Sequence, residues 1–135
     1  MISSYSLSKL VPADTILEFD TTRILTGCTV THVDGSPTFT LTKPGYYYIT
    51  FDATATSTTT GEITVQLQNG TEAIPAAASS VTVATAGDLS PVGFTTIVKV
   101  LPSCCAIDNT TKLSILNTGV AATFTDATIN ITKLC

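Results

Sequence analysis

The residues that could perform acid–base or nucleophilic chemistry are few, and they are not spaced as a catalytic site. The chain has one histidine, His32, followed by Asp34 and Ser36 at the end of a predicted strand. A Ser-His-Asp triad is recognised by its geometry, and no nucleophile-elbow motif accompanies these three residues. Glu18 and Asp20 share a strand face within a polar segment, which favours a solvated edge over an acid–base pair. We therefore expect no catalytic residues and no enzyme activity.

The four cysteines also lack the spacing of a metal site. Structural zinc sites commonly use two ligand pairs, each separated by two to four residues, whereas two of the cysteines here are adjacent. One interpretation is that all four are small buried thiols in a reducing compartment. The alternative is one or two disulfides, such as Cys28 with Cys135, or a bridge between subunits at Cys135. The four residues are Cys28, Cys104, Cys105 and Cys135.

Three loop carboxylates could offer oxygen ligands to a cation such as Ca²⁺. They are Asp34, Asp88 and Asp108, and no defined ligand spacing relates them. The glycines are isolated and turn-like, so there is no glycine-rich loop to hold a phosphate. We interpret the loop carboxylates as exposed turn residues and expect neither a metal nor a cofactor.

The composition excludes several classes of function. Only 12 % of the 135 residues are charged, 44 % are hydrophobic, and the mean hydropathy is +0.39, which is too apolar for a disordered chain. The net charge of −4 argues against nucleic acid and against a membrane-binding basic patch. The first residues do not have the pattern of a signal peptide, and no apolar run reaches the length of a membrane span. We expect a chain made in the cytosol or carried within an assembled particle.

The residue pattern indicates an all-β domain. Threonine supplies 28 of the 135 residues by direct count, and β-branched residues favour a pleated surface. Apolar residues recur with a period of two, and Gly, Asn and Asp mark the turns between segments. This predicts an antiparallel two-sheet β-sandwich with jelly-roll topology over residues 14–135, preceded by an attachment arm over residues 1–13. The expected strands are Thr15–Phe19, Ile24–Val33, Thr38–Leu41, Tyr46–Ser57, Glu62–Gln68, Ala73–Ala77, Ser80–Ala84, Val92–Leu101, Lys112–Leu116 and Ala127–Leu134.

The most informative segment is Thr38–Ala55, TFTLTKPGYYYITFDATA, because its long strand is apolar on both faces. Tyr47 alternates with Tyr46 and Tyr48, so two tyrosines point away from the expected core. Each tyrosine can bury about 150–250 Å², which favours a second apolar contact on that side.

The segment ending at Leu101 shows the same double-sided pattern. We expect another subunit to cover this face; a loop or the N-terminal arm is the alternative. The predicted subunit contact consists of Tyr46, Tyr48, Ile97 and Leu101. The predicted core consists of Ile49, Phe51, Ile63, Val65, Leu67, Ile129 and Ile131.

Three segments resemble the trimeric jelly rolls of the tumour-necrosis-factor and complement-globular-head superfamily. In Thr38–Ala55 a short strand is followed by Lys43-Pro44-Gly45 and then by a long strand that carries aromatics. The segments Val65–Gly70 and Ala127–Leu134 are similar to a later strand with its turn and to the final core strand of that pattern. The resemblance implies a homotrimer. The threonine-rich character is more like that of the short jelly rolls of bacteriophages and of bacterial spore-surface proteins.

From this resemblance we expect a bacteriophage virion structural protein, a homotrimeric knob that acts as a capsid decoration or head-fibre component. It would be assembled in the host cytoplasm and would bind other virion or surface-assembly proteins through the N-terminal arm, with no nucleic acid or membrane partner. The alternative is a receptor- or carbohydrate-binding tip of a phage fibre or spore-surface protein. Its host-surface ligand would then sit on loops such as Asp34–Pro37, Thr58–Gly61 or Ala86–Pro91.

Overall fold

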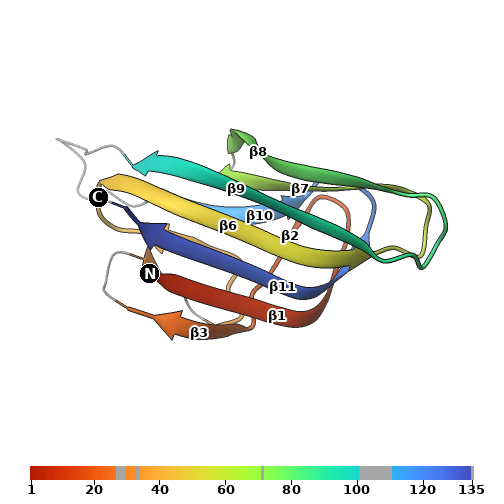
Figure 1. Cartoon of the computed structure of the whole chain (residues 1–135), viewed down its shortest axis with the longest axis horizontal. Helices are drawn as coiled ribbons and strands as arrows, with labels where there is room; N and C mark the ends of the chain where they lie inside the picture. The colour runs from red at the N-terminus through yellow and green to blue at the C-terminus, as the bar shows by residue number, and fades with distance from the viewer. Residues whose placement is uncertain (27–29, 33, 71, 101–110, 135) are drawn as a thin grey trace.

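Two antiparallel sheets pack face to face in the computed structural model, which describes residues 1–26, 30–32, 34–70, 72–100 and 111–134 (Figure 1). The five-stranded sheet has the order β3-β1-β11-β6-β9, and the six-stranded sheet has the order β4-β5-β10-β7-β8, with β2 paired to β10. The predicted antiparallel jelly-roll sandwich is confirmed. The strands are β1 (Ile2–Val11), β2 (Thr15–Ile16), β3 (Thr21–Leu25), β4 (Val30–Thr31), β5 (Phe39–Leu41), β6 (Gly45–Thr56), β7 (Gly61–Asn69), β8 (Glu72–Val83), β9 (Ser90–Val100), β10 (Thr111–Asn117) and β11 (Ala122–Lys133).

Within the part of the chain that the structure describes, no helix has the length and apolarity needed to cross a membrane.

Most of residues 1–13 belong to the sandwich and do not form a separate arm. Strand β1 lies between β11 and β3, and Ile2 pairs with Ile131 on one side and with Leu25 on the other. Ile2, Ser4 and Ser6 face the interior and are fully buried. Serine is small enough to fit under the opposite sheet. Because serine is polar, the alternation of apolar and polar residues that indicates a strand is absent from this part of the sequence. The boundary at residue 13 therefore needs correction.

Strand β8 is continuous where two strands were expected, because Ala78 and Ser79, at the predicted break, pair regularly with Gln66 and Val65 of β7. A β-bulge lies earlier, within the first of the two predicted strands. Gln66 pairs with Ala78, but Gln68 pairs with Ala73, so the β8 residues from Ile74 to Ala77 lie opposite the single β7 residue Leu67. The Nε2 atom of Gln66 lies 2.8 Å from the carbonyl oxygen of Ile74 and 3.2 Å from that of Ala77. This side-chain amide satisfies backbone groups that the bulge removes from the ladder.

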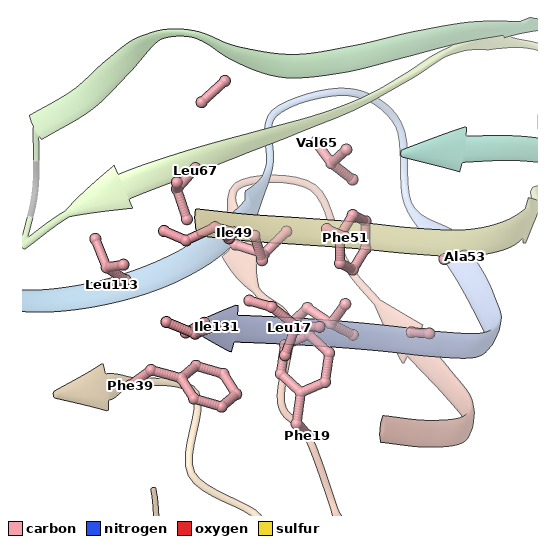
Figure 2. Close-up of a cluster of buried hydrophobic side chains, with 14 of the residues drawn as sticks. Leu17, Phe19, Phe39, Ile49, Phe51, Ala53, Val65, Leu67, Leu113 and Ile131 are labelled. Carbon is pink, nitrogen blue, oxygen red and sulfur yellow. The ribbon is translucent and has the colours of Figure 1, made fainter. Parts of the chain in front are cut away.

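The core lies between the two sheets, and Figure 2 shows its side chains converging from both layers. All seven residues assigned to the core from the sequence are fully buried: Ile49, Phe51, Ile63, Val65, Leu67, Ile129 and Ile131. Phe19 and Phe39 extend this cluster, with ring centroids 5.4 Å apart in an edge-to-face arrangement, and Phe19 lies 6.3 Å from the ring of Phe51. Such aromatic pairs contribute about 0.5–1.5 kcal/mol beyond the area that they bury.

The middle tyrosine of the trio is part of this core. Tyr47 is fully buried, and its hydroxyl donates a hydrogen bond of 2.6 Å to the carbonyl oxygen of Lys43. Burial raises the pKa of Tyr47, because a phenolate would lose its hydration. The hydroxyl ties the turn between β5 and β6 to the interior.

We expect Tyr47→Phe to lower the free energy of unfolding at neutral pH by about 1 kcal/mol, through loss of this hydrogen bond. The cost should shrink as the pH rises above the ordinary tyrosine pKa of 10.0. There the unfolded wild-type chain releases its phenolic proton before the folded chain does, so wild type loses a stability term that the variant lacks. Urea unfolding of both proteins across this range measures the difference. Tyr5→Phe is the matched control, and a difference that stays constant with pH would contradict the buried-phenol interpretation.

Candidate subunit interface

Several exposed apolar residues lie on the outer face of the five-stranded sheet, the face turned away from the six-stranded sheet. Tyr46, Tyr48 and Ile97 are 43 %, 39 % and 56 % exposed in the single chain. Tyr48 pairs with Ile97, and Tyr46 pairs with Lys99, whose Nζ lies 5.6 Å from the centre of the Tyr46 ring. We call Tyr46, Tyr48 and Ile97 the tyrosine patch. Leu101, the fourth residue predicted for the contact, lies outside the described residues.

A strip of threonines runs beside the tyrosine patch along the two central strands. Outward-facing positions of β6 pair with outward-facing positions of β11, and Asn130 donates a hydrogen bond of 3.1 Å from Nδ2 to Thr50 Oγ1. The strip therefore offers hydroxyl groups in a regular array and little apolar area. Its threonines are Thr50, Thr54, Thr56, Thr123, Thr125, Thr128 and Thr132.

A shallow hollow of about 560 Å³ interrupts this face where β6 meets β9. Asp52 and Asp126 line it, and Asp126 sits at the β11 bulge with a φ of 51°. A Cβ placed on Gly93 would lie 2.5 Å from Asp52 Oδ1 and 2.6 Å from the carbonyl oxygen of Phe51. Glycine is therefore needed at position 93 to let the Asp52 carboxylate lie across the neighbouring strand. Among the described residues, no group of three or more His, Cys, Asp and Glu side chains is placed to hold a metal.

The single histidine, His32, is held in place by hydrogen bonds and by ring stacking. A carbonyl oxygen can only accept, so His32 Nε2 donates to the carbonyl oxygen of Ser36 at 2.9 Å, while Nδ1 lies 3.0 Å from Thr22 Oγ1. The imidazole stacks on Phe39 with ring centroids 4.2 Å apart, and Asp34 Oδ1 accepts a hydrogen bond from the backbone of Thr22. A catalytic triad would require the ring nitrogens to bind the Ser36 hydroxyl and the Asp34 carboxylate. Both nitrogens bind other groups instead.

The carboxylates of Glu18 and Asp20 converge on one lysine. Lys9 Nζ lies 2.9 Å from Asp20 Oδ1 and 3.7 Å from Glu18 Oε2 at the exposed edge of β1. The hydrogen bond to Asp20 is the main cause that raises the pKa of Lys9. Two ionised carboxylates that share a cation form a surface ion-pair network, which joins β1 to the segment before β3.

The four cysteines all lie outside the described residues, so their pairing stays a prediction.

The fold is shared with known structures. The tumour-necrosis-factor ligand Eiger of S. frugiperda aligns with a TM-score of 0.69 over 99 % of this chain and 92 % of its own, at 11 % identity. Vertex protein P5 of PRD1 aligns at 0.61 over 99 % and 96 %, with 16 % identity. Murine APRIL aligns at 0.58 over 99 % and 100 %, with 10 % identity. The sequence itself matches no protein-family model and no curated protein.

These alignments confirm the predicted resemblance at the level of the fold, which is a jelly roll of the tumour-necrosis-factor type. Two apolar residues of the same outer face were missed from the sequence. Leu10 was assigned to the N-terminal arm. Ile24 was placed in a predicted strand but was not assigned to either face of the sheet. The outward position of Leu10 could have been found only by treating the serine-rich start of the chain as a strand, and that of Ile24 follows from its pairing with Ser3 of that strand.

We expect Gly93→Ala to lower the free energy of unfolding by about 1–3 kcal/mol, the usual cost of forcing a group into a packed space. The new methyl group would clash with the backbone of β6, which cannot yield as a side chain can. Asp52→Ala combined with Gly93→Ala should recover only part of the loss, because the contact with the carbonyl oxygen of Phe51 remains. Thermal unfolding of the three variants tests this, and full recovery in the double variant would show that the carboxylate is the sole obstacle.

Proposed function

We propose that this chain is a structural protein of a bacteriophage virion and forms a homotrimeric knob on the particle. The observation that carries the proposal is the exposed tyrosine patch on the outer face of the five-stranded sheet. Full burial of a large apolar side chain contributes about 1.5–3 kcal/mol, and these three are 39 %, 43 % and 56 % exposed, so covering them would contribute roughly half of that amount each, which favours a protein contact. Aromatic residues are also enriched at the centres of protein interfaces.

The fold comparisons support both parts of this proposal. Two of the aligned structures are tumour-necrosis-factor-type ligands, and the sequence resembles the trimeric jelly rolls of that superfamily. A third is described as a vertex protein, a component of a viral particle, and it aligns over nearly its full length. A capsid decoration or head-fibre component fits these observations, because three copies on one axis would multiply weak surface contacts through avidity.

The groups that could have served catalysis have structural partners instead. His32 is held between Thr22 and the carbonyl oxygen of Ser36, and Glu18 and Asp20 neutralise Lys9. This supports presentation of a surface as the mechanism. Localisation on the virion follows from the same proposal.

Light scattering should give a mass three times the 14.0 kDa of one chain. Tyr48→Glu and Ile97→Glu should each reduce that mass toward one chain, because a charge would have to be buried without a partner. Thr82→Glu, at an exposed position of β8 in the other sheet, is the matched control and should leave the mass unchanged. A wild-type protein that stays monomeric at high concentration would refute the trimer.

Antibodies raised against the folded protein should label purified particles of the phage that encodes it, and mass spectrometry should detect the chain in those particles. The label should lie on the particle surface, as expected for a knob. Absence of the chain from purified particles, with the protein present only in the infected-cell lysate, would refute the virion assignment while leaving the trimer untouched.

A further inference from the structure

A threefold ring needs two different contact patches on each subunit. Only twofold contacts join identical patches; in a closed ring of three, each subunit presents one surface to the next and a different surface to the previous one. The tyrosine patch lies at the β6–β9 side of the outer face, so it can supply only half of such a contact. The inference about the second contact patch rests on the proposed homotrimer.

The opposite side of the same face also carries exposed apolar residues. Leu10 of β1 is 68 % exposed, and Ile24 of β3 is 41 % exposed. Leu10 pairs with Thr123, an outward-facing residue of the threonine strip, so Leu10 faces outward as well. Ile24 pairs with Ser3, which in turn pairs with Asn130 of the same face. The threonine strip therefore has apolar residues on both of its flanks.

The apolar residues on the two flanks match in their position along the strands. One row across the sheet contains Leu10, Thr123 and Thr56. Ser90 pairs with Ala55, so continuing the β9 register by one residue puts Leu89, 68 % exposed, at the far end of that row. The end of β1 and the start of β9 both lie at the end of the sandwich opposite the two termini (Figure 1).

A second match lies toward the termini. The row that contains Ile24 passes through Asn130 and Thr50, one step along the strands from the row in which Tyr48 pairs with Ile97. Successive rows on one face are about 7 Å apart, twice the rise per residue of a strand. This separation is within reach of a tyrosine side chain.

We propose that Leu89 of one subunit packs against Leu10 of the next, while the tyrosine patch packs toward Ile24 of that same neighbour. We place the threefold axis parallel to the strands, so that residues of one row have the same height on all three subunits and meet across the contact. Within one subunit Leu10 and Leu89 are about three strand spacings apart, roughly 14 Å, and cannot cover each other. A hollow of about 90 Å³ bordered by Leu10, Thr123 and Gly87 lies on this row and can admit part of the neighbour's side chain.

The test is a charge exchange at the two leucines, read out by light scattering. Leu10→Glu and Leu89→Glu should each lower the mass from three chains toward one, and so should the double variant with glutamate at both positions. The combination of Leu10→Lys with Leu89→Glu should restore the threefold mass, because opposite charges would then meet across each contact. Leu25→Glu is the matched control, since Leu25 is similarly exposed but pairs with Ile2 on the inward-facing side of the sheet.

A zero-length carbodiimide reagent gives a second readout on the restored variant. It should join positions 10 and 89 between subunits and yield covalent trimers, because within one subunit these positions are too far apart to be joined. Threefold mass in every single variant, or failure of the opposite charges to restore it, would overturn this pairing. If Tyr48→Glu still dissociates the protein in that case, the trimer stands and only the pairing is wrong; if wild type is monomeric, the trimer itself is wrong.

Discussion

The two-sided character of strand β6 is the constraint on which the rest of the structure depends. Its odd-numbered residues from Tyr47 to Ala55 are buried in the core, and the even-numbered ones lie on the outer face of the five-stranded sheet. A one-residue shift in register would exchange these two sets and expose Phe51 while burying Asp52. The pairing of β6 with β11 and with β9 over most of its length prevents that shift. One strand thus fixes both the core and the candidate interface.

The outer face combines two kinds of chemistry that act in different ways. In the proposed trimer, apolar side chains at its flanks would supply the favourable free energy of association, which is non-directional. The threonine strip between them supplies hydroxyl groups that donate and accept, and these can form hydrogen bonds with a neighbour only in a limited set of orientations. An all-apolar face would associate in many ways, so the polar strip favours a single arrangement. The carboxylates of Asp52 and Asp126 add a further restriction, because a neighbour must leave them hydrated or bring a partner for them.

The sequence allowed the fold class and β6 itself to be predicted, because threonine-rich alternation and the Pro-Gly turn are local signals. The β7–β8 hairpin at Asn69-Gly70 was predictable for the same reason, and Gly70 has the expected positive φ of 64°. Strand β1 was missed because its buried positions hold serine. The β8 bulge was missed because the amide that fills it belongs to Gln66, on another strand.

The candidate interface could be predicted only in part, for a similar reason. The tyrosines form a run that is conspicuous in the sequence, whereas Leu10 and Leu89 are far apart along the chain and share a row only through the pairing of four strands. Phe19 likewise joins the core from a segment that pairs with no long strand. Long-range register decides such placements, and no local pattern reports it.

The pairing of the first strand with the last has a consequence for synthesis. Ile2 lies opposite Ile131, so the five-stranded sheet cannot close until residue 131 has left the ribosome. Until then β1 and β6 each lack a hydrogen-bonded neighbour, and unpaired strands in a nascent chain are prone to associate with other chains. A topology dominated by such distant contacts also folds slowly. We therefore expect rapid synthesis through residue 131, or a chaperone, to protect the open sheet from aggregation.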